Sequence, residues 1–137
     1  MSAPTAFALA SLLHLGFQAT VTLLVYPALV RVGREHPEDW SDVHARHSRG
    51  IAPIVAVVYS ALLASGVWVL TGEVGAWEAL AGAGAVGAAL TTAFGAAPTH
   101  GRLSVPEPAL LRRLIVLDRV RATWAVVGAV ASVLALV

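Results

Sequence analysis

Cysteine and lysine are both absent from this sequence, and charged residues of any kind are scarce. The lack of cysteine excludes disulfides, thiolate metal sites and thiol-based redox relays, so any metal would need histidine, carboxylate or tyrosine ligands. Only 12% of the 137 residues are charged, whereas 58% are hydrophobic and the mean hydropathy is +0.78. A water-soluble domain of this length needs more polar surface to cover its core. We therefore expect an integral membrane protein whose solvent is the lipid bilayer.

Long apolar runs, separated by short polar segments, predict the fold class. A helix rises about 1.5 Å per residue, so about 20 apolar residues cross a hydrocarbon core of about 30 Å. The first run is too long for a signal peptide and lacks a basic leader, so we interpret it as a retained helix. Pro53 is expected in the first turn of the second helix, and Pro98 is expected to end the third. The prediction is a single domain, an all-α four-helix transmembrane bundle with helices at about 5–30, 51–70, 77–97 and 114–137.

All nine basic residues are arginines, and they fall on one side of the predicted bundle. They are Arg31, Arg34, Arg46, Arg49, Arg102, Arg112, Arg113, Arg119 and Arg121. The opposite side carries only Glu73 and Glu78. Because basic residues close to membrane helices stay in the cytoplasm, we expect a multi-pass cell-membrane protein with both termini extracytoplasmic. The formal net charge is +1, and nothing in the sequence indicates a nucleic-acid partner.

Small residues predict where the last two helices pack, because they allow close approach of backbones in a membrane. The third helix has Ala79, Ala83 and Gly87 at four-residue spacing with Gly84 and Ala88 alongside, and the fourth has Ala122, Ala125, Ala129 and Ser132. No strand precedes these glycines and no lysine follows them, so neither a dinucleotide fingerprint nor a phosphate loop applies.

One polar stripe runs down the otherwise apolar first helix. Ser11, His14, Gln18, Thr22 and Tyr26 follow one another at steps of three or four residues, so they share a face. We expect this face to point into the bundle, because a histidine within the membrane is costly to expose to lipid. His14 is then either a functional residue with a partner or a side chain that simply hydrogen-bonds a neighbouring helix. Gln18 is typical of interhelical hydrogen bonding.

Residues 37–47 predict a short interfacial helix between the first two membrane helices, with a proline in its first turn and acids near its positive end. Trp40 would anchor this helix at the interface. His44 and His47 share a face, where they would act as metal ligands or as a proton-handling pair, with Asp42 orienting one of them. A surface amphipathic helix explains the two histidines equally well.

A third polar cluster precedes and opens the fourth helix. It contains His100, and also Asp118 and Arg121, which are three residues apart and can pair. Arg119 points elsewhere. Two interpretations remain open: a basic anchor with a structural ion pair, or an arginine that binds a phenolate, carboxylate or propionate of a ligand entering from the bilayer.

Several short motifs, spread over nearly the whole chain, carry a family resemblance. They are Tyr26-Pro27-Ala28-Leu29, Ile51-Ala52-Pro53, Ala97-Pro98-Thr99-His100-Gly101-Arg102-Leu103 and Leu117-Asp118-Arg119-Val120-Arg121-Ala122-Thr123-Trp124. The chain thus resembles the anthrone oxygenase-like family of small four-helix membrane proteins. The resemblance implies membrane-embedded oxidation of lipophilic polyphenols. In the family we expect an asparagine, followed three residues later by an arginine, at the start of the fourth helix. Here Asp118 stands in the place of the asparagine and Arg121 in that of the arginine.

Our leading functional hypothesis is an enzyme with a cytoplasm-facing pocket for a flat lipophilic aromatic small molecule, such as an anthrone-like phenol that is oxidised to a quinone. His14 or His44 would act as the base, and Arg121, paired with Asp118, would stabilise the resulting anion. We expect the ligand contacts to come from Gln18, Tyr26, His100 and Trp124.

Other functions remain open beside this hypothesis. In a binding protein without catalysis, haem or a copper-type ion would be held by His14, His44, His47 and His100, with His44 and His47 as the first metal ligands. An accessory membrane subunit, with or without formation of a homo-oligomer, is a further alternative. The sequence does not decide whether the cofactor is a metal, haem or none.

Overall fold

The computed structural model describes all 137 residues, and every regular element in it is a helix. The first of four long helical rods comprises α1 (Ala3–Thr20), a π-helical turn (Val21–Val25) and α2 (Tyr26–Glu35). The second is a 3₁₀ turn (Pro37–Asp39) followed by α3 (Trp40–Val69). The third comprises α4 (Ala76–Thr91), a second π-helical turn (Thr92–Ala96) and α5 (Ala97–Arg102), and the fourth is α6 (Pro108–Leu134). The predicted all-α architecture of four long helices is confirmed.

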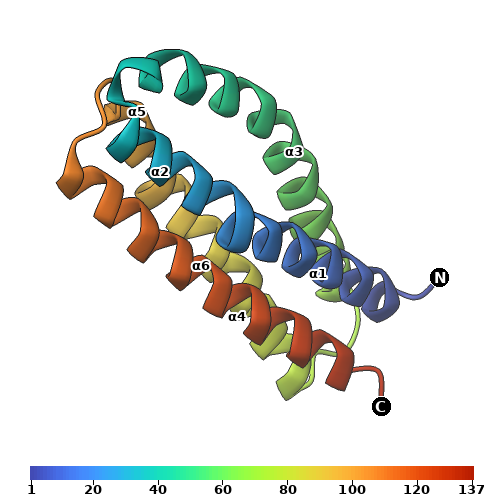
Figure 1. Cartoon of the computed structure of the whole chain (residues 1–137). Coiled ribbons are helices and arrows are strands. Elements are labelled where there is room, and N and C mark those ends of the chain that lie inside the picture. Colours follow the sequence, from blue (N-terminus) through green and yellow to red (C-terminus); the bar gives the residue numbers. More distant parts are fainter.

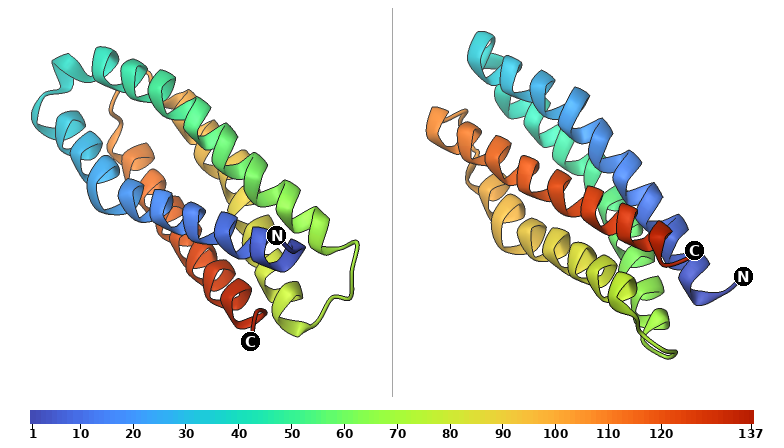
Figure 2. Two further views of the ribbon diagram at one scale, coloured as in Figure 1. Left: turned by 90° about the vertical axis from the view of Figure 1, so that its right-hand side faces the viewer. Right: turned by 90° about the horizontal axis from the view of Figure 1, so that it is seen from below.

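The four rods lie side by side, and the chain reverses direction after each of the first three (Figure 1). Both termini lie at one end of the bundle together with the α3–α4 connection, while the α2–α3 and α5–α6 connections lie at the other end (Figure 2). We call this other end the arginine end, because seven of the nine arginines belong to α2, α5 and the N-terminal parts of α3 and α6, while Arg119 and Arg121 lie near the middle of α6.

Three of the rods are long and apolar enough to cross a membrane: Ala3–Glu35, Pro37–Val69 and Ala76–Arg102. Large apolar side chains on their outer surfaces are unprotected by protein: Leu23 is 71% exposed, Val57 67% and Phe94 76%. Such a surface belongs in lipid rather than in water, so the chain is a membrane protein. In α6, by contrast, every 18-residue stretch contains Asp118, Arg119 and Arg121, and this helix lacks so clear a membrane signal.

The predicted boundaries of the second helix were wrong. Residues 37–47 do not form a separate interfacial helix, because they make up the 3₁₀ turn and the first turns of α3, which begins at Trp40 rather than near Ile51. Pro53 therefore lies inside α3, where proline removes a backbone hydrogen bond and bends a helix. Figure 1 shows α3 as a curved rod. Trp40 is not an interfacial anchor: it is 1% exposed, and its Nε1–H donates to the carbonyl of Leu103 at 2.9 Å.

Pro98 does not end the third rod, which continues to Arg102. A π-helical turn immediately precedes Ala97-Pro98, and another immediately precedes Tyr26-Pro27 in the first rod. Such a turn closes i→i+5 hydrogen bonds and accommodates one extra residue, which makes room for the proline ring where a regular helix would clash. The fourth helix begins at Pro108, earlier than the predicted residue 114, and ends at Leu134.

The closest helix packing joins α4 to α6. A Cβ atom on Gly84 would lie 2.7 Å from the Cα of Gly128, so the two backbones meet at these glycines. Gly87 similarly lies against the ring of Trp124. The predicted stripe on α6 was right for Ala125, Ala129 and Ser132, which are buried. On α4 the buried face is Ala81, Gly84, Ala85 and Ala88, whereas Ala79 and Ala83 are exposed.

Candidate functional site

The polar stripe of the first rod points into the bundle, as predicted. Ser11, His14, Gln18 and Tyr26 are each 3% exposed or less. The π-helical turn helps to keep them aligned, because repeated four-residue steps drift around a regular helix and one extra residue in the turn reduces the drift. The first rod therefore presents hydrogen-bonding groups to α6 and to the third rod.

A buried ion pair on α6 contacts this polar stripe. Arg121 donates from Nη2 to Oδ1 of Asp118 at 2.9 Å, and Nε2 of Gln18 donates to the same oxygen at 2.8 Å. Both charged side chains are almost fully buried, at 5% and 3% side-chain exposure. The predicted pairing of Asp118 with Arg121 is confirmed, and Arg119 is exposed, as expected. Gln18 thus fixes the orientation of a carboxylate that in turn fixes a guanidinium.

From Arg121 a chain of hydrogen bonds leads to two histidines. Arg121 donates from Nη2 to the hydroxyl of Tyr26 at 3.1 Å, with its guanidinium 5.5 Å from the centre of the tyrosine ring. The same hydroxyl lies 3.0 Å from Nε2 of His100, whose Nδ1 lies 3.0 Å from Nε2 of His44. The two imidazoles are stacked, and His44 also stacks on Trp40. Side chains from α2, α3, α5 and α6 meet in this chain.

A cavity of about 330 Å³ lies beside this chain, at the lower end of the size range of ligand pockets. Its polar wall includes Tyr26, His47, His100 and Arg121. The apolar wall consists of Phe17, Val21, Ile51, Ala52, Val55, Ala56, Ala96 and Ala97. The site therefore combines a largely apolar space with a few convergent polar groups.

Two nitrogens of the polar wall have no hydrogen-bond partner. They are Nε2 of His47 and Nε of Arg121, and both are shielded from solvent. An unpaired buried polar atom costs free energy of folding, about 1–3 kcal/mol, unless a ligand or water satisfies it. Both residues line the cavity, but these two nitrogens lie just beneath its surface, and a bound molecule would reach them only after a rotation of the side chains.

Not every predicted site residue reaches this cavity. His14 lies against the ring of Tyr59, with ring centres 4.9 Å apart, and does not line the cavity. His44 does not line the cavity either, but it contacts His100, which does. Trp124 is a packing residue over Gly87 rather than a cavity residue. Asp42 is exposed and makes no hydrogen bond to either neighbouring histidine.

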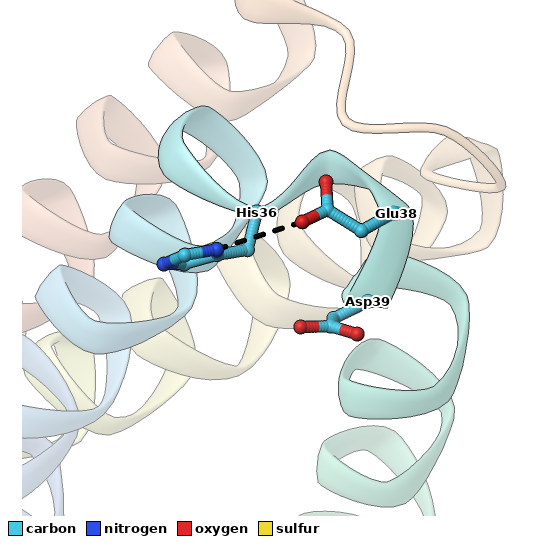
Figure 3. Close-up of side chains that lie close together, drawn as sticks. All are labelled: His36, Glu38 and Asp39. Carbon is cyan, nitrogen blue, oxygen red and sulfur yellow. Dashed lines mark ion pairs between the residues drawn. The ribbon is translucent and has the colours of Figure 1, made fainter.

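The structure does not arrange His44 and His47 as a ready metal site. His44 already uses Nε2 in its contact with His100, and these histidines do not belong to a group of three ligand atoms close enough to share an ion. The one such group is His36, Glu38 and Asp39, which Figure 3 shows between α2 and α3. All three are exposed, and His36 lies 3.6 Å from Glu38. Exposed groups of this kind are common without a metal ion.

Sequence reasoning missed two features of the site. The carbonyl of Leu103, which orients Trp40, carries no signal in the side-chain pattern. The hydroxyl of Tyr59 bonds that of Thr92 at 2.9 Å, which links α3 to the second π-helical turn. Neither partner was detectable from spacing, because each pair joins residues more than thirty positions apart.

Comparison with protein-family models, with curated proteins and with solved structures finds no match for this chain. The functional argument therefore rests on the site and on the sequence motifs.

Proposed function

We propose that this protein is a four-span membrane enzyme of the oxygenase type. In this proposal it binds a flat, lipophilic phenol, such as an anthrone, in the cavity at its arginine end and oxidises it to a quinone. The observation that carries the proposal is the largely apolar cavity whose wall also includes the polar side chains of Tyr26, His47, His100 and Arg121. The resemblance to the anthrone oxygenase-like family supports the same class of substrate.

The proposal includes a fourth membrane crossing. Because α6 packs directly on α4 through Gly84 and Gly128, it should cross the bilayer wherever α4 does. Its buried Asp118 and Arg121 neutralise one another, which lowers the cost of their charges in the membrane. Arg119 is exposed, and its long side chain would extend toward the headgroups at the arginine end. The arginine end would face the cytoplasm.

The surface around the cavity supports entry of the ligand from the bilayer. A surface groove between the first rod and α3 shares Phe17, Val21, His47 and Ile51 with the cavity wall. Its outer part includes Ile54, which is 51% exposed on the apolar surface. A lipophilic molecule dissolved in the membrane would thus reach the cavity without passing through water.

In this proposal, rotation of the His47 and Arg121 side chains brings their unpaired nitrogens to the cavity surface, where each has one role. Nε2 of His47 would accept the proton of the phenol, and the Nε–H of Arg121 would donate to the resulting oxyanion. The electron-rich anion would then react with dioxygen. One substrate carbon would gain an oxygen atom and lose two hydrogens, while the second oxygen atom would leave as water. His47 takes the role that the sequence analysis gave to His14 or His44, because only His47 combines a place in the cavity wall with a free nitrogen.

The experiment uses the purified protein in lipid nanodiscs with two probes. Binding of 2-naphthol is followed by its fluorescence, and oxidation of anthrone by the absorbance of anthraquinone and by oxygen uptake. We expect the wild type to bind and oxidise. Ala56→Trp, which fills the cavity, should abolish both activities, while His47→Ala should retain binding and lose about 10²-fold or more in rate.

The matched control is His36→Ala, which removes an exposed histidine at the same end of the bundle, outside the cavity. It should bind and oxidise like the wild type. Binding without oxidation in the wild type would contradict the enzyme and leave a binding protein. An absorption spectrum and metal analysis of the same sample would then show whether haem or a metal ion is the group bound.

A further inference from the structure

The chain of hydrogen bonds from Arg121 to His44 has a direction. Arg121 has only donors, so the oxygen of Tyr26 must accept from it. Tyr26 then has one proton to give, and its neighbour is Nε2 of His100. When His100 is neutral and accepts at Nε2, its proton is on Nδ1, from which it donates to Nε2 of His44. His44 therefore holds its own proton on Nδ1.

This order of donors leads from the cavity toward the arginine end. Tyr26 and His100 line the cavity, whereas His44 does not. His44 is only half-buried and lies in the second turn of α3, beside the exposed residues Ser41 and Ala45. The inner end of the chain is held in place by the ion pair with Asp118, and the outer end by stacking on Trp40.

We infer that Tyr26, His100 and His44 form a proton relay that connects the cavity with the aqueous phase at the arginine end. An acid in the cavity gives its proton to the oxygen of Tyr26, Tyr26 passes its own proton to Nε2 of His100, and His100 passes its Nδ1 proton to Nε2 of His44. His44 releases its Nδ1 proton to water. One proton enters and one leaves, and the imidazoles end with their protons on the opposite nitrogens until the chain resets.

The relay goes beyond the proposed oxidation, because any acid that reaches the Tyr26 oxygen can use it. The charged and titratable groups around it are Arg121 and Asp118 at the inner end and His47, whose ring centre lies 5.8 Å from that of His100. No carboxylate contacts the two relay histidines, so no acidic side chain competes for the proton between Tyr26 and water.

The test reads the position of each imidazole proton by ¹⁵N NMR of histidine-labelled protein in nanodiscs, without any substrate. In the wild type we expect His100 and His44 both to be protonated on Nδ1. In Tyr26→Phe the donor to Nε2 of His100 is lost, so both histidines should change to the form protonated on Nε2. The control Tyr59→Phe also removes one buried hydroxyl, but one bonded to Thr92, and it should leave both tautomers unchanged.

A second variant keeps the inference testable if Tyr26→Phe does not fold. His44→Phe preserves a ring to stack on Trp40 and removes the outlet, so exchange of the His100 Nδ1 proton with water should slow by about 10²-fold, the lower end of a general acid–base contribution. A wild-type His100 protonated on Nε2, tautomers unaltered in Tyr26→Phe, or unchanged exchange in His44→Phe would each overturn the relay. These NMR measurements need no ligand, so they test the relay independently of the anthrone assay, which tests the proposed oxidation.

Discussion

At the scale of single residues, Asp118 is the acceptor on which the buried polar network depends. Its Oδ1 receives hydrogen bonds from both Gln18 and Arg121. Asp118→Leu would leave the guanidinium of Arg121 buried without a counter-charge, and removing one partner of a buried pair costs about 3–5 kcal/mol in the free energy of unfolding. We expect a loss of this size in equilibrium unfolding in mixed detergent micelles.

The double variant Asp118→Leu/Arg121→Met makes this prediction specific. With both charges gone, no buried charge stays unpaired, so the double variant should be more stable than Asp118→Leu alone. Arg119→Met removes an exposed arginine of the same helix without leaving a buried charge unpaired, so it should not lower the free energy of unfolding. Additive losses from the two single substitutions would show that the pair does not act as a unit.

Residue spacing predicted part of this network and missed the rest for a physical reason. The partnership of Asp118 with Arg121 follows from their place one turn apart on a helix. The contact of Tyr26 with His100 joins residues 74 positions apart, and its existence depends on how two rods are aligned. Spacing also placed His44 and His47 on one face, but only the packed structure shows that His47 enters the cavity while His44 lies behind His100.

At the scale of elements, the contact between α4 and α6 depends on the absence of a side chain at Gly84. A Cβ there would meet backbone atoms of Gly128 at 2.7 Å, and backbone cannot turn away as a flexible side chain can. Gly84→Ala should therefore push the helices apart and lower the free energy of unfolding by about 1–3 kcal/mol. Thermal unfolding in detergent would measure the loss.

Gly82→Ala is the control for this prediction, since it makes the same change on the same helix. A Cβ on Gly82 would have no atom within 4 Å. Because alanine favours a helix over glycine, this variant should be neutral or more stable by up to about 1 kcal/mol. Equal losses in the two variants would mean that helix propensity, and not close packing, sets the effect.

The element boundaries were the least predictable part of the fold. Proline was taken as a sign of a helix start at Pro53 and of a helix end at Pro98, yet both lie within continuous rods. At Pro98 the π-helical turn Thr92–Ala96 relieves the clash of the proline ring with the preceding turn. No residue type in Thr92–Ala96 is diagnostic of a π-helical turn. The polar residues before Ile51 belong to α3, where Trp40 bonds the carbonyl of Leu103 just after α5 and His44 contacts His100 of α5. Hydropathy does not record such tertiary contacts.

At the scale of the whole molecule, the even number of rods and the position of the arginines together predict on which side of the membrane each end of the bundle lies. Both termini lie at the end opposite the arginine end (Figure 2). If the arginine end is cytoplasmic, then the termini and the α3–α4 connection face outward together. The hydropathy of the first three rods supports three crossings, so the fate of α6 alone determines on which side residue 137 emerges.

The absence of cysteine makes this topology directly measurable, because each introduced cysteine is the only thiol in the chain. We expect Ser2→Cys, Glu73→Cys and Leu136→Cys to react with a membrane-impermeant maleimide on intact cells. Glu38→Cys and Ser104→Cys, exposed at the arginine end, should react only after the cells are opened.

Protection of Leu136→Cys alone would show that α6 does not cross the membrane, since labelling of Glu73→Cys independently places the α3–α4 connection outside. Inversion of the whole pattern would instead keep the four crossings and reverse the orientation. The buried pair of Asp118 and Arg121 favours the first pattern, because it lets a helix with three central charges carry only one of them, Arg119, toward lipid.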